Sequence, residues 1–451
     1  MVGGGFGGKE DMSVQHHAAL LAQKTGRPVK VKLTRQESIL VHPKRHAMEI
    51  DLTTACDENG KLTAMKAVII SDTGAYASLG GPYNYQNIDI TGRAYYTNNP
   101  PAGAFRGFGV PQSCFATECN LNQLAEMAGL TPFEIRYINA VRPGDTLPNG
   151  QIADENTAIV ETLDAVREIC EKNPKAGIAC AIKNSGLGVG VPDTGRCRIT
   201  VKDGKVHVTS SAACIGQGMG TVQIQMLCEA AGLTPDMVIY DTPDAKYSPN
   251  AGNTTASRQT LFTGEAVVRA ASLLREALDK EGSLSALNGR EFYGEYTGVT
   301  DKMGSPKEHP VSHVAYSYAT QVVELNDNGT IKRVVAAHDV GTPVNPKALE
   351  GQIEGGVVMS LGYALTESFP LEQGRPMAKL GTLGLFRADK TPDVVPVIID
   401  RRMNGPAFRA KGIGEISSIP TAPAVQLAYY NRDGKFRTRL PLEDTPYSRK
   451  K

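Results

Sequence analysis

Glycine-rich loops recur at wide intervals along this chain of 451 residues, and they constrain its fold more than any other feature. They lie at residues 3–8, 103–109, 186–190, 216–220 and 412–414. Glycine lets backbone N–H groups converge on an anion, because no Cβ blocks the approach. Several such loops, each ahead of an expected helix or strand, predict one large anionic ligand bound by backbone amides and helix N-termini. The alternative is that 47 glycines in 451 residues produce loops by chance.

The first loop, Gly3-Gly4-Gly5-Phe6-Gly7-Gly8-Lys9-Glu10, fits two phosphate-binding patterns incompletely. Gly3, Gly8 and Lys9 have the spacing of a P-loop, but Glu10 stands where a Ser or Thr hydroxyl would hold magnesium. The glycines of the dinucleotide fingerprint are also present, but that fingerprint must follow a strand, and only two residues precede it. A glycine-rich segment that only leads into a helix would explain the glycines, but not why Phe6 and Glu10 stand among them.

Apolar periodicity predicts hairpins layered with helices, which is an α+β fold rather than a doubly wound parallel sheet. Two-residue alternation on either side of Asp-Glu-Asn-Gly, Asp-Gly and Asn-Asp-Asn-Gly turns predicts three antiparallel hairpins, and a shorter alternation predicts a strand over 29–33. The hairpins span residues 48–71, 196–210 and 321–337. Helical spacing predicts helices near 14–24, 112–127, 158–170, 222–231, 264–278, 350–365 and 421–430. A polar, Pro-containing break at 172–175 predicts two domains, 1–172 and 173–451.

Composition excludes several function classes. A formal net charge of +1 gives no electrostatic case for nucleic acid or an anionic membrane, and 6% aromatic residues without Trp argue against base stacking. The sequence has no apolar run of transmembrane length and no secretory signal pattern. The eight cysteines form no C-x-x-C pair, which argues against an iron–sulfur cluster or zinc ribbon in this chain. We therefore expect a cytoplasmic protein with free thiols.

Two loops place a charge among apolar neighbours. Arg106 lies in Ala-Phe-Arg-Gly-Phe-Gly, and Glu415 lies in Gly-Ile-Gly-Glu-Ile. A carboxylate in apolar surroundings can act as a general base near neutral pH. Arg106 could equally form a structural ion pair, and Glu415 could cap the helix expected at 421–430, so both alternatives stay open on the residues alone.

The loops together resemble a known family. Gly-Gly-Gly-Phe-Gly-Gly-Lys-Glu at 3–10, Ala-Phe-Arg-Gly-Phe-Gly-Val-Pro-Gln at 104–112, Gly-Gln-Gly at 216–218 and Lys-Gly-Ile-Gly-Glu at 411–415 occur in this order. The set is similar to the molybdopterin-binding part of the xanthine dehydrogenase and aldehyde oxidase family, over essentially the whole chain. The resemblance implies an α+β architecture with two molybdopterin-binding domains.

The resemblance also implies the chemistry. A molybdenum ion would be held by the dithiolene of a pterin, with no protein side chain as a direct ligand. Glu415 matches the base that deprotonates the metal's hydroxo ligand, so that oxygen derived from water attacks an electron-poor carbon. Glu10 and Arg106 match the two polar positions that grip purines, Arg106 also as a catalytic group, with Thr255 and Ala256 beside them. Cofactor contacts are implied at Gly5, Phe6, Gly7, Gly216, Gln217, Gly218, Ser257 and Gln352.

The function that the resemblance implies is hydroxylation of a xanthine- or hypoxanthine-like purine, with a nicotinate- or aldehyde-type hydroxylase as the alternative. We expect molybdopterin in its cytosine dinucleotide form, with 2Fe–2S clusters and FAD on partner subunits or domains. An upstream molybdopterin-binding segment is expected on another chain or is missing. A nucleotide-binding protein is disfavoured by Glu10 and the missing strand. A non-catalytic assembly subunit is disfavoured because it would have no physical need for Arg106 and Glu415.

Overall fold

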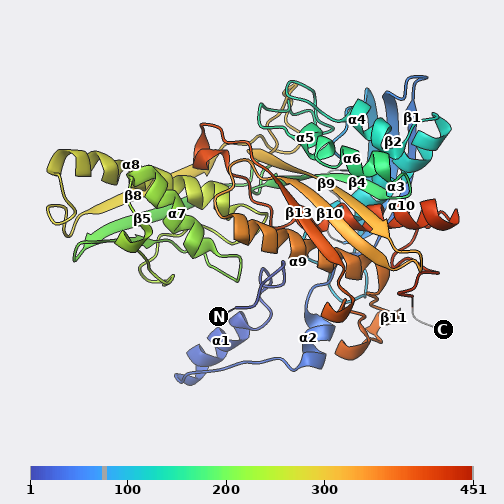
Figure 1. Cartoon of the computed structure of the whole chain (residues 1–451). Helices are drawn as coiled ribbons and strands as arrows, with labels where there is room; N and C mark the ends of the chain where they lie inside the picture. The colour runs from blue at the N-terminus through green and yellow to red at the C-terminus, as the bar shows by residue number, and fades with distance from the viewer. Residues whose placement is uncertain (1, 74–78, 449–451) are drawn as a thin grey trace.

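The computed structural model describes residues 2–73 and 79–448, which form a central lobe, a peripheral lobe and an N-terminal arm (Figure 1). The arm contains α1 (Gln15–Thr25) and α2 (Arg35–Val41), drawn in blue below the two lobes. In the described ranges, none of the helices combines the length and the apolar character needed to cross a membrane.

The central lobe is built around a four-stranded sheet of order β13-β10-β9-β4. Its strands are β4 (Gly177–Ser185), β9 (Ala315–Leu325), β10 (Ile331–Asp339) and β13 (Asp393–Ile399). The first three pair antiparallel, whereas β13 pairs parallel to β10. Ala179 and Ala181 of β4 pack with α9 (Pro346–Leu365) and α10 (Thr421–Asp433) in one core cluster. Ile178 and Ile182 belong to the core on the other face, together with residues of α5 (Ile159–Asp164).

A smaller sheet of order β1-β2-β3 adjoins this lobe. Its strands β1 (Met48–Cys56) and β2 (Leu62–Asp72) form a hairpin, and β3 (Asn87–Tyr95) runs parallel to β2. The helices near it are α3 (Val110–Met127), α4 (Pro132–Asn139) and α6 (Arg167–Lys172). A short β11 (Leu371–Glu372) and β12 (Arg375–Pro376) pair lies beside the arm in Figure 1.

The peripheral lobe contains the sheet β7-β6-β5-β8, covered by two helices (Figure 1). The strands are β5 (Asp193–Lys202), β6 (Lys205–Thr209), β7 (Val238–Tyr240) and β8 (Glu291–Gly298), and the helices are α7 (Met219–Ala231) and α8 (Gln259–Glu281). Alternate residues of β5 are buried, as expected for a sheet with one covered face. A Cβ on Gly294 would lie 1.9 Å from the carbonyl oxygen of Ala266, so glycine allows α8 to pack directly on β8.

The sequence predictions of fold class and hairpins are confirmed, since all three hairpins form within an α+β architecture. The strand predicted over 29–33 is wrong: this stretch has no regular structure and leads into α2, whose Thr34–Glu37 capping box sets its start. The helix predicted over 158–170 is broken between α5 and α6. The predicted break falls between α6 and β4, but one core cluster joins residues from both sides, and the domain boundary stays a prediction.

Candidate active site

The Gly412–Glu415 loop is anchored at both ends, which fixes the position of Glu415. Before it, the ammonium group of Lys411 pairs with Asp339 at the end of β10, at 2.5 Å, and both side chains are buried. After it, residues 416–418 form a short 3-10 helix. A Cβ on Gly412 would lie only 1.8 Å from the carbonyl oxygen of Ser257, so this position requires glycine. The loop therefore lies directly against the segment that ends at Ser257.

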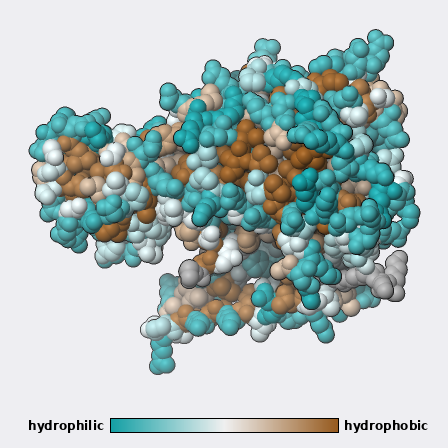
Figure 2. Space-filling view, in the orientation of Figure 1, coloured by the Kyte–Doolittle hydropathy of each residue, from teal (hydrophilic) through white to brown (hydrophobic). Residues whose placement is uncertain are grey.

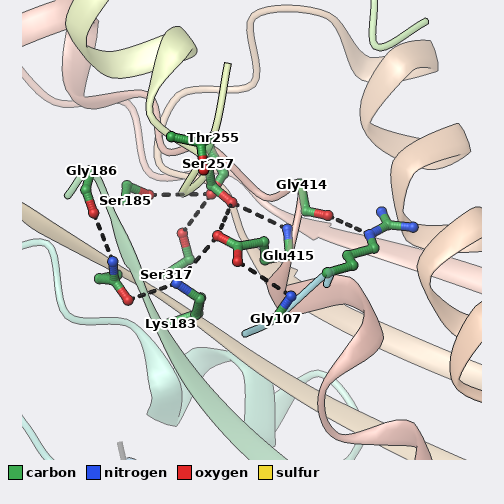
Figure 3. Close-up of polar contacts among 12 residues, drawn as sticks. Gly107, Lys183, Ser185, Gly186, Thr255, Ser257, Ser317, Gly414 and Glu415 are labelled. Carbon is green, nitrogen blue, oxygen red and sulfur yellow. Dashed lines mark hydrogen bonds and ion pairs between the residues drawn. The ribbon is translucent and has the colours of Figure 1, made fainter. Parts of the chain in front are cut away.

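Groups from three separate segments contact the Glu415 carboxylate (Figure 3). The Lys183 ammonium lies 3.2 Å from Oε2, and the Ser257 hydroxyl donates to the same oxygen at 3.1 Å. The backbone N–H of Gly107 donates to Oε1 at 3.2 Å. The Glu415 backbone N–H in turn donates to Ser257 Oγ at 3.2 Å. The Glu415 side chain is 15% exposed, so the carboxylate remains partly accessible to solvent although these contacts hold it in place.

Arg106 holds the loop on both sides of Glu415. Its Nε donates to the Gly414 carbonyl at 2.5 Å, and its Nη2 donates to Ser417 Oγ and to the Gln352 carbonyl, both at 3.0 Å. Burial lowers the pKa of the guanidinium to about 10, which leaves it charged at neutral pH. The hydrogen bonds of this guanidinium run to α9 and to the Glu415 loop, and its predicted contact with substrate stays a prediction.

The first glycine loop packs beside Arg106. The Arg106 backbone N–H donates to the Phe6 carbonyl at 2.8 Å, and its guanidinium lies 5.5 Å from the centre of the Phe6 ring. Gly7 has φ +100°, and a Cβ there would lie 2.2 Å from the Ala104 carbonyl oxygen. The sequence therefore needs glycine here, because the two loops touch through their backbones.

Glu10 is joined to the same site through residues 254–257. The Thr255 hydroxyl donates to Glu10 Oε1 at 2.5 Å, just as Ser257 donates to Glu415. Ala256 and Ser257 both adopt positive φ, of +45° and +52°, a strained conformation that directs the two hydroxyls to the two carboxylates. Burial raises the pKa of Glu10, against the effects of Thr255 and Lys9, and the charge of Glu415 raises it further. The two carboxylates thus lie close enough to interact electrostatically.

Backbone N–H groups of the Gly216–Gly220 segment converge on the sulfur of Cys214. Burial would raise the pKa of this thiol, but hydrogen bonds from the N–H groups of Gly216, Gly218, Met219 and Gly220 lower the pKa overall. A Cβ on Gly216 would lie 3.5 Å from the Val2 carbonyl oxygen, so this loop also adjoins the first one. The donor set fits an anionic, phosphate-bearing cofactor. The loops at 3–8, 103–109, 216–220 and 412–415 therefore adjoin one another, and the anionic ligand expected to bind them stays a prediction.

The remaining predicted cofactor residues differ in what their side chains contact. Gln217 folds back on its own loop, accepting from Ile215 N at 2.7 Å and donating to the Ala213 carbonyl. Gln352 lies against Arg106, with its side-chain oxygen 3.3 Å from Nη2. Gly5 is close to Ile215, since a Cβ there would lie 3.1 Å from Ile215 Cδ1. Their predicted contacts with a pterin stay predictions.

Sequence reasoning missed Lys183. The strand that carries it, β4, is buried on both faces and therefore reads as a continuous apolar run without alternation. A lysine at the end of Gly-Ile-Ala-Cys-Ala-Ile was the available signal, because a buried cation needs a partner. Over residues 2–73 and 79–448, no group of three or more His, Cys, Asp and Glu side chains has the arrangement of a metal site.

The space-filling view shows how the arm lies relative to the two lobes. In Figure 2 the arm projects below the central lobe, and a gap separates it from the peripheral lobe. The visible surface is largely hydrophilic, with apolar patches on the faces of both lobes and along the arm (Figure 2).

Comparisons with known proteins match most of this chain to molybdopterin-binding proteins. A family model described as a molybdopterin cofactor-binding domain matches residues 1–140, and a second of the same description matches residues 160–288 and 280–392. A xanthine dehydrogenase molybdenum-binding protein of Escherichia coli is 31% identical over 505 residues, covering 98% of this chain and 67% of that protein. The large molybdopterin subunit of nicotinate dehydrogenase from Eubacterium barkeri is 43% identical over 178 residues, covering 37% of this chain and 42% of that protein.

Among solved structures, the aldehyde oxidoreductase from Desulfovibrio gigas superposes with a TM-score of 0.88 at 29% identity. The match covers 98% of this chain and 53% of that one. The chain thus spans about two thirds of the Escherichia coli relative and about half of the aldehyde oxidoreductase.

Proposed function

We propose that this chain, which belongs to the xanthine dehydrogenase and aldehyde oxidase family of molybdopterin-binding oxidoreductases, hydroxylates a purine-type N-heterocycle as part of a molybdenum hydroxylase. The observation that carries the proposal is the Glu415 carboxylate, which is held beside the glycine loops by two hydrogen bonds and one ion pair from three segments. A carboxylate fixed in this way is preorganised to accept a proton at one oxygen atom.

The glycine loops would hold the cofactor through their backbone N–H groups. Residues 4–7 and 216–220 supply these groups, and the proposed neighbours of the cofactor are Phe6, Ser257 and Gln352. The molybdenum cofactor, when bound, supplies the metal centre that accepts electrons from the substrate. Glu415 would take up the proton released as the substrate carbon gains its oxygen, and the contacts of Arg106 would keep the Glu415 backbone in place meanwhile.

Glu10 supports the choice of an N-heterocycle over an aldehyde. Burial raises its pKa, which favours the protonated form more than in an exposed glutamate. A carboxylate can accept from a ring N–H, and a protonated carboxyl group can donate to a ring nitrogen. Thr255 fixes one of its oxygens, which leaves the other for a ligand. An aldehyde offers no second polar edge, and it would leave this group without a partner.

The experiment compares kcat/KM for hypoxanthine, xanthine, nicotinate and a simple aldehyde, in the wild-type complex and in Glu10→Gln. Loss of a hydrogen bond to a charged group costs roughly 1.5–3 kcal/mol, so purine kcat/KM should fall about tenfold or more, with the aldehyde value nearly unchanged. A wild-type preference for the aldehyde, or an equal loss for both classes, would overturn the purine assignment.

The second candidate is a nicotinate-type hydroxylase. It is favoured by one observation, the 43% identity to part of a nicotinate dehydrogenase large molybdopterin subunit. The same substrate panel distinguishes it: a wild-type kcat/KM for nicotinate well above the values for the purines selects this candidate.

We further propose that the cofactor is molybdopterin cytosine dinucleotide and that partner subunits or domains in the cytoplasm carry 2Fe–2S clusters and FAD. The reason to place the clusters on partners is the sequence itself, because the eight cysteines of this chain form no C-x-x-C pair. Purification of the native complex, with metal, pterin and flavin analysis, tests this. Activity of the isolated polypeptide with an external electron acceptor would contradict the need for partners.

A further inference from the structure

Lys183 is a buried cation in direct contact with the proposed base. It lies on β4, two residues before Ser185, so both side chains point from the same face of the strand. Ser185 donates to the Gly412 carbonyl at 3.2 Å, while the Lys183 ammonium lies 3.2 Å from Glu415 Oε2 and donates to Asn184 Oδ1 at 2.7 Å. The Lys183 side chain is only 7% exposed (Figure 3).

We propose that Lys183 is a positioning residue that keeps Glu415 ionised and turned so that Oε1, not Oε2, accepts the proton. This inference rests on the proposed function, in which Glu415 is the base. It names a residue that the family motifs leave out, because Lys183 lies outside all of the glycine loops.

The two oxygens of Glu415 differ in their donors. Oε2 accepts the Ser257 hydroxyl at 3.1 Å and forms an ion pair with the Lys183 ammonium at 3.2 Å. Oε1 accepts the single N–H of Gly107, at 3.2 Å. A carboxylate oxygen has two lone pairs in the plane of the group, so Oε1 keeps one for a proton, whereas a proton on Oε2 would lie against the Lys183 ammonium. The ion pair therefore selects the reactive oxygen as well as the charge state.

Other charges also face Glu415, and their placement explains why Lys183 is needed. Glu10 interacts unfavourably with it, whereas Arg106 and Arg45 are cations near enough to interact favourably. The hydrogen bonds of the two arginines, however, run to backbone carbonyls and to side chains other than that of Glu415. In the part of the chain that the structure describes, Lys183 is the one cation within ion-pair distance of Glu415.

The test uses the native, cofactor-loaded complex with Lys183→Met, which keeps length and removes charge, and Lys183→Arg, which restores charge. An opposite charge at this distance lowers the pKa of a carboxyl group by about one unit or more. In Lys183→Met the acid limb of the pH profile of kcat/KM should therefore move to higher pH by about one unit. At a pH below that limb, kcat/KM should be roughly tenfold lower than in the wild type. Lys183→Arg should restore most of the shift. The exposed Lys202→Met, on β5, is the matched control and should leave the limb unchanged.

A second readout needs no turnover. Infrared difference spectra between acid and neutral pH should contain a protonated-carboxyl band that is absent in Glu415→Gln, and this band should titrate at higher pH in Lys183→Met. If Lys183→Met changes neither the acid limb of the kcat/KM profile nor the titration of the carboxyl band, the inference is overturned. A raised KM with an unchanged acid limb would also overturn it, because it would identify Lys183 as a substrate contact. Full activity of Glu415→Gln would instead overturn the proposed function, so the two failures are distinguishable.

Discussion

The N-terminal arm and the site around Glu415 are stabilised in opposite ways. We call this site the corner: it consists of the 412–417 loop and the residues that contact it, Arg106, Gly107, Lys183 and Ser257. In the corner, contacts join residues more than 150 positions apart, such as Ser257 with Glu415 and Arg106 with Gly414. In the arm, α1 has no buried residue, and α2 is set by a capping box within its own first turn. Function thus depends on a region that only the complete fold can assemble, whereas the arm consists of local structure.

Carboxyl groups illustrate the same difference. In the arm, hydrogen bonds from Thr34 lower the pKa of Glu37, which is fully exposed to solvent. Near the corner, burial raises the pKa of Glu367 to about 7, although Arg45 opposes the rise. A local contact stabilises the charge of Glu37 in the arm, while the packed environment disfavours the charge of Glu367.

Removing the guanidinium of Arg106 should have the largest effect on the fold. Arg106→Met leaves the acceptors on Gly414, Gln352 and Ser417, which are partly or fully buried, without their donor. An unpaired group costs up to about 1–3 kcal/mol when it is fully buried. We expect a fall of several kcal/mol in the free energy of unfolding and a loss of activity with purine and aldehyde alike. Thermal and denaturant unfolding measure the first effect, with the exposed Arg35→Met of α2 as control. A loss confined to purine turnover, with unchanged stability, would instead support a substrate contact.

Gly412→Ala should disturb the corner next most strongly. The new Cβ would lie 1.8 Å from the Ser257 carbonyl oxygen, so backbone must move, at a cost of about 1–3 kcal/mol. Gly351→Ala in α9 is the matched control, because no atom lies within 4 Å of its added Cβ, and it should stabilise by roughly 0.5–1 kcal/mol. Equal unfolding midpoints for the two variants would show that the loop is not tightly held.

The pH dependence of stability should come partly from Glu367. Because its pKa is raised in the folded protein, the folded state binds more protons than the unfolded state between the unfolded value, about 4.3, and about 7. Its contribution to stability is therefore fully present below that window and is lost as the pH rises through it. Glu367→Gln should flatten the pH dependence of the unfolding midpoint between about pH 5 and 8, while the exposed Glu372→Gln should keep the wild-type dependence. A wild-type midpoint that rises across this window would contradict the shift.

Thr34→Ala should have the smallest effect. It removes the α2 capping box, worth about 1 kcal/mol, in a helix that packs little against the lobes. Amide hydrogen exchange in α2 should become several times faster, while turnover and the global unfolding midpoint stay the same. A lower global midpoint would show that the arm is coupled to the corner.

The sequence predicted what local patterns determine. Hairpin turns, helix periodicity and glycine loops gave the elements, and the family motif placed Glu10, Arg106, Ser257 and Glu415 in one site. The sequence could not predict the hydrogen-bond partners of the Arg106 guanidinium, because these lie 246 to 311 positions away and are brought to it only by the tertiary fold. Lys183 escaped for a related reason, since a strand buried on both faces shows no alternation to mark which side chains face a site.

The strand wrongly predicted over 29–33 teaches the converse. Its residues alternate, but no neighbouring strand pairs with them among residues 2–73 and 79–448, and an unpaired alternation does not make a sheet. Local pattern is reliable for helices that cap themselves, and less so for strands that need a distant partner.

The most direct test of the central claim, that Glu415 is the base, is the rate at which substrate reduces the loaded complex in a single turnover. Glu415→Gln keeps the shape of the side chain and removes its basic site. We predict a reduction rate lower by roughly two to four orders of magnitude, with wild-type molybdenum and pterin content and an unchanged unfolding midpoint. A near-wild-type rate at full metal content would contradict the account.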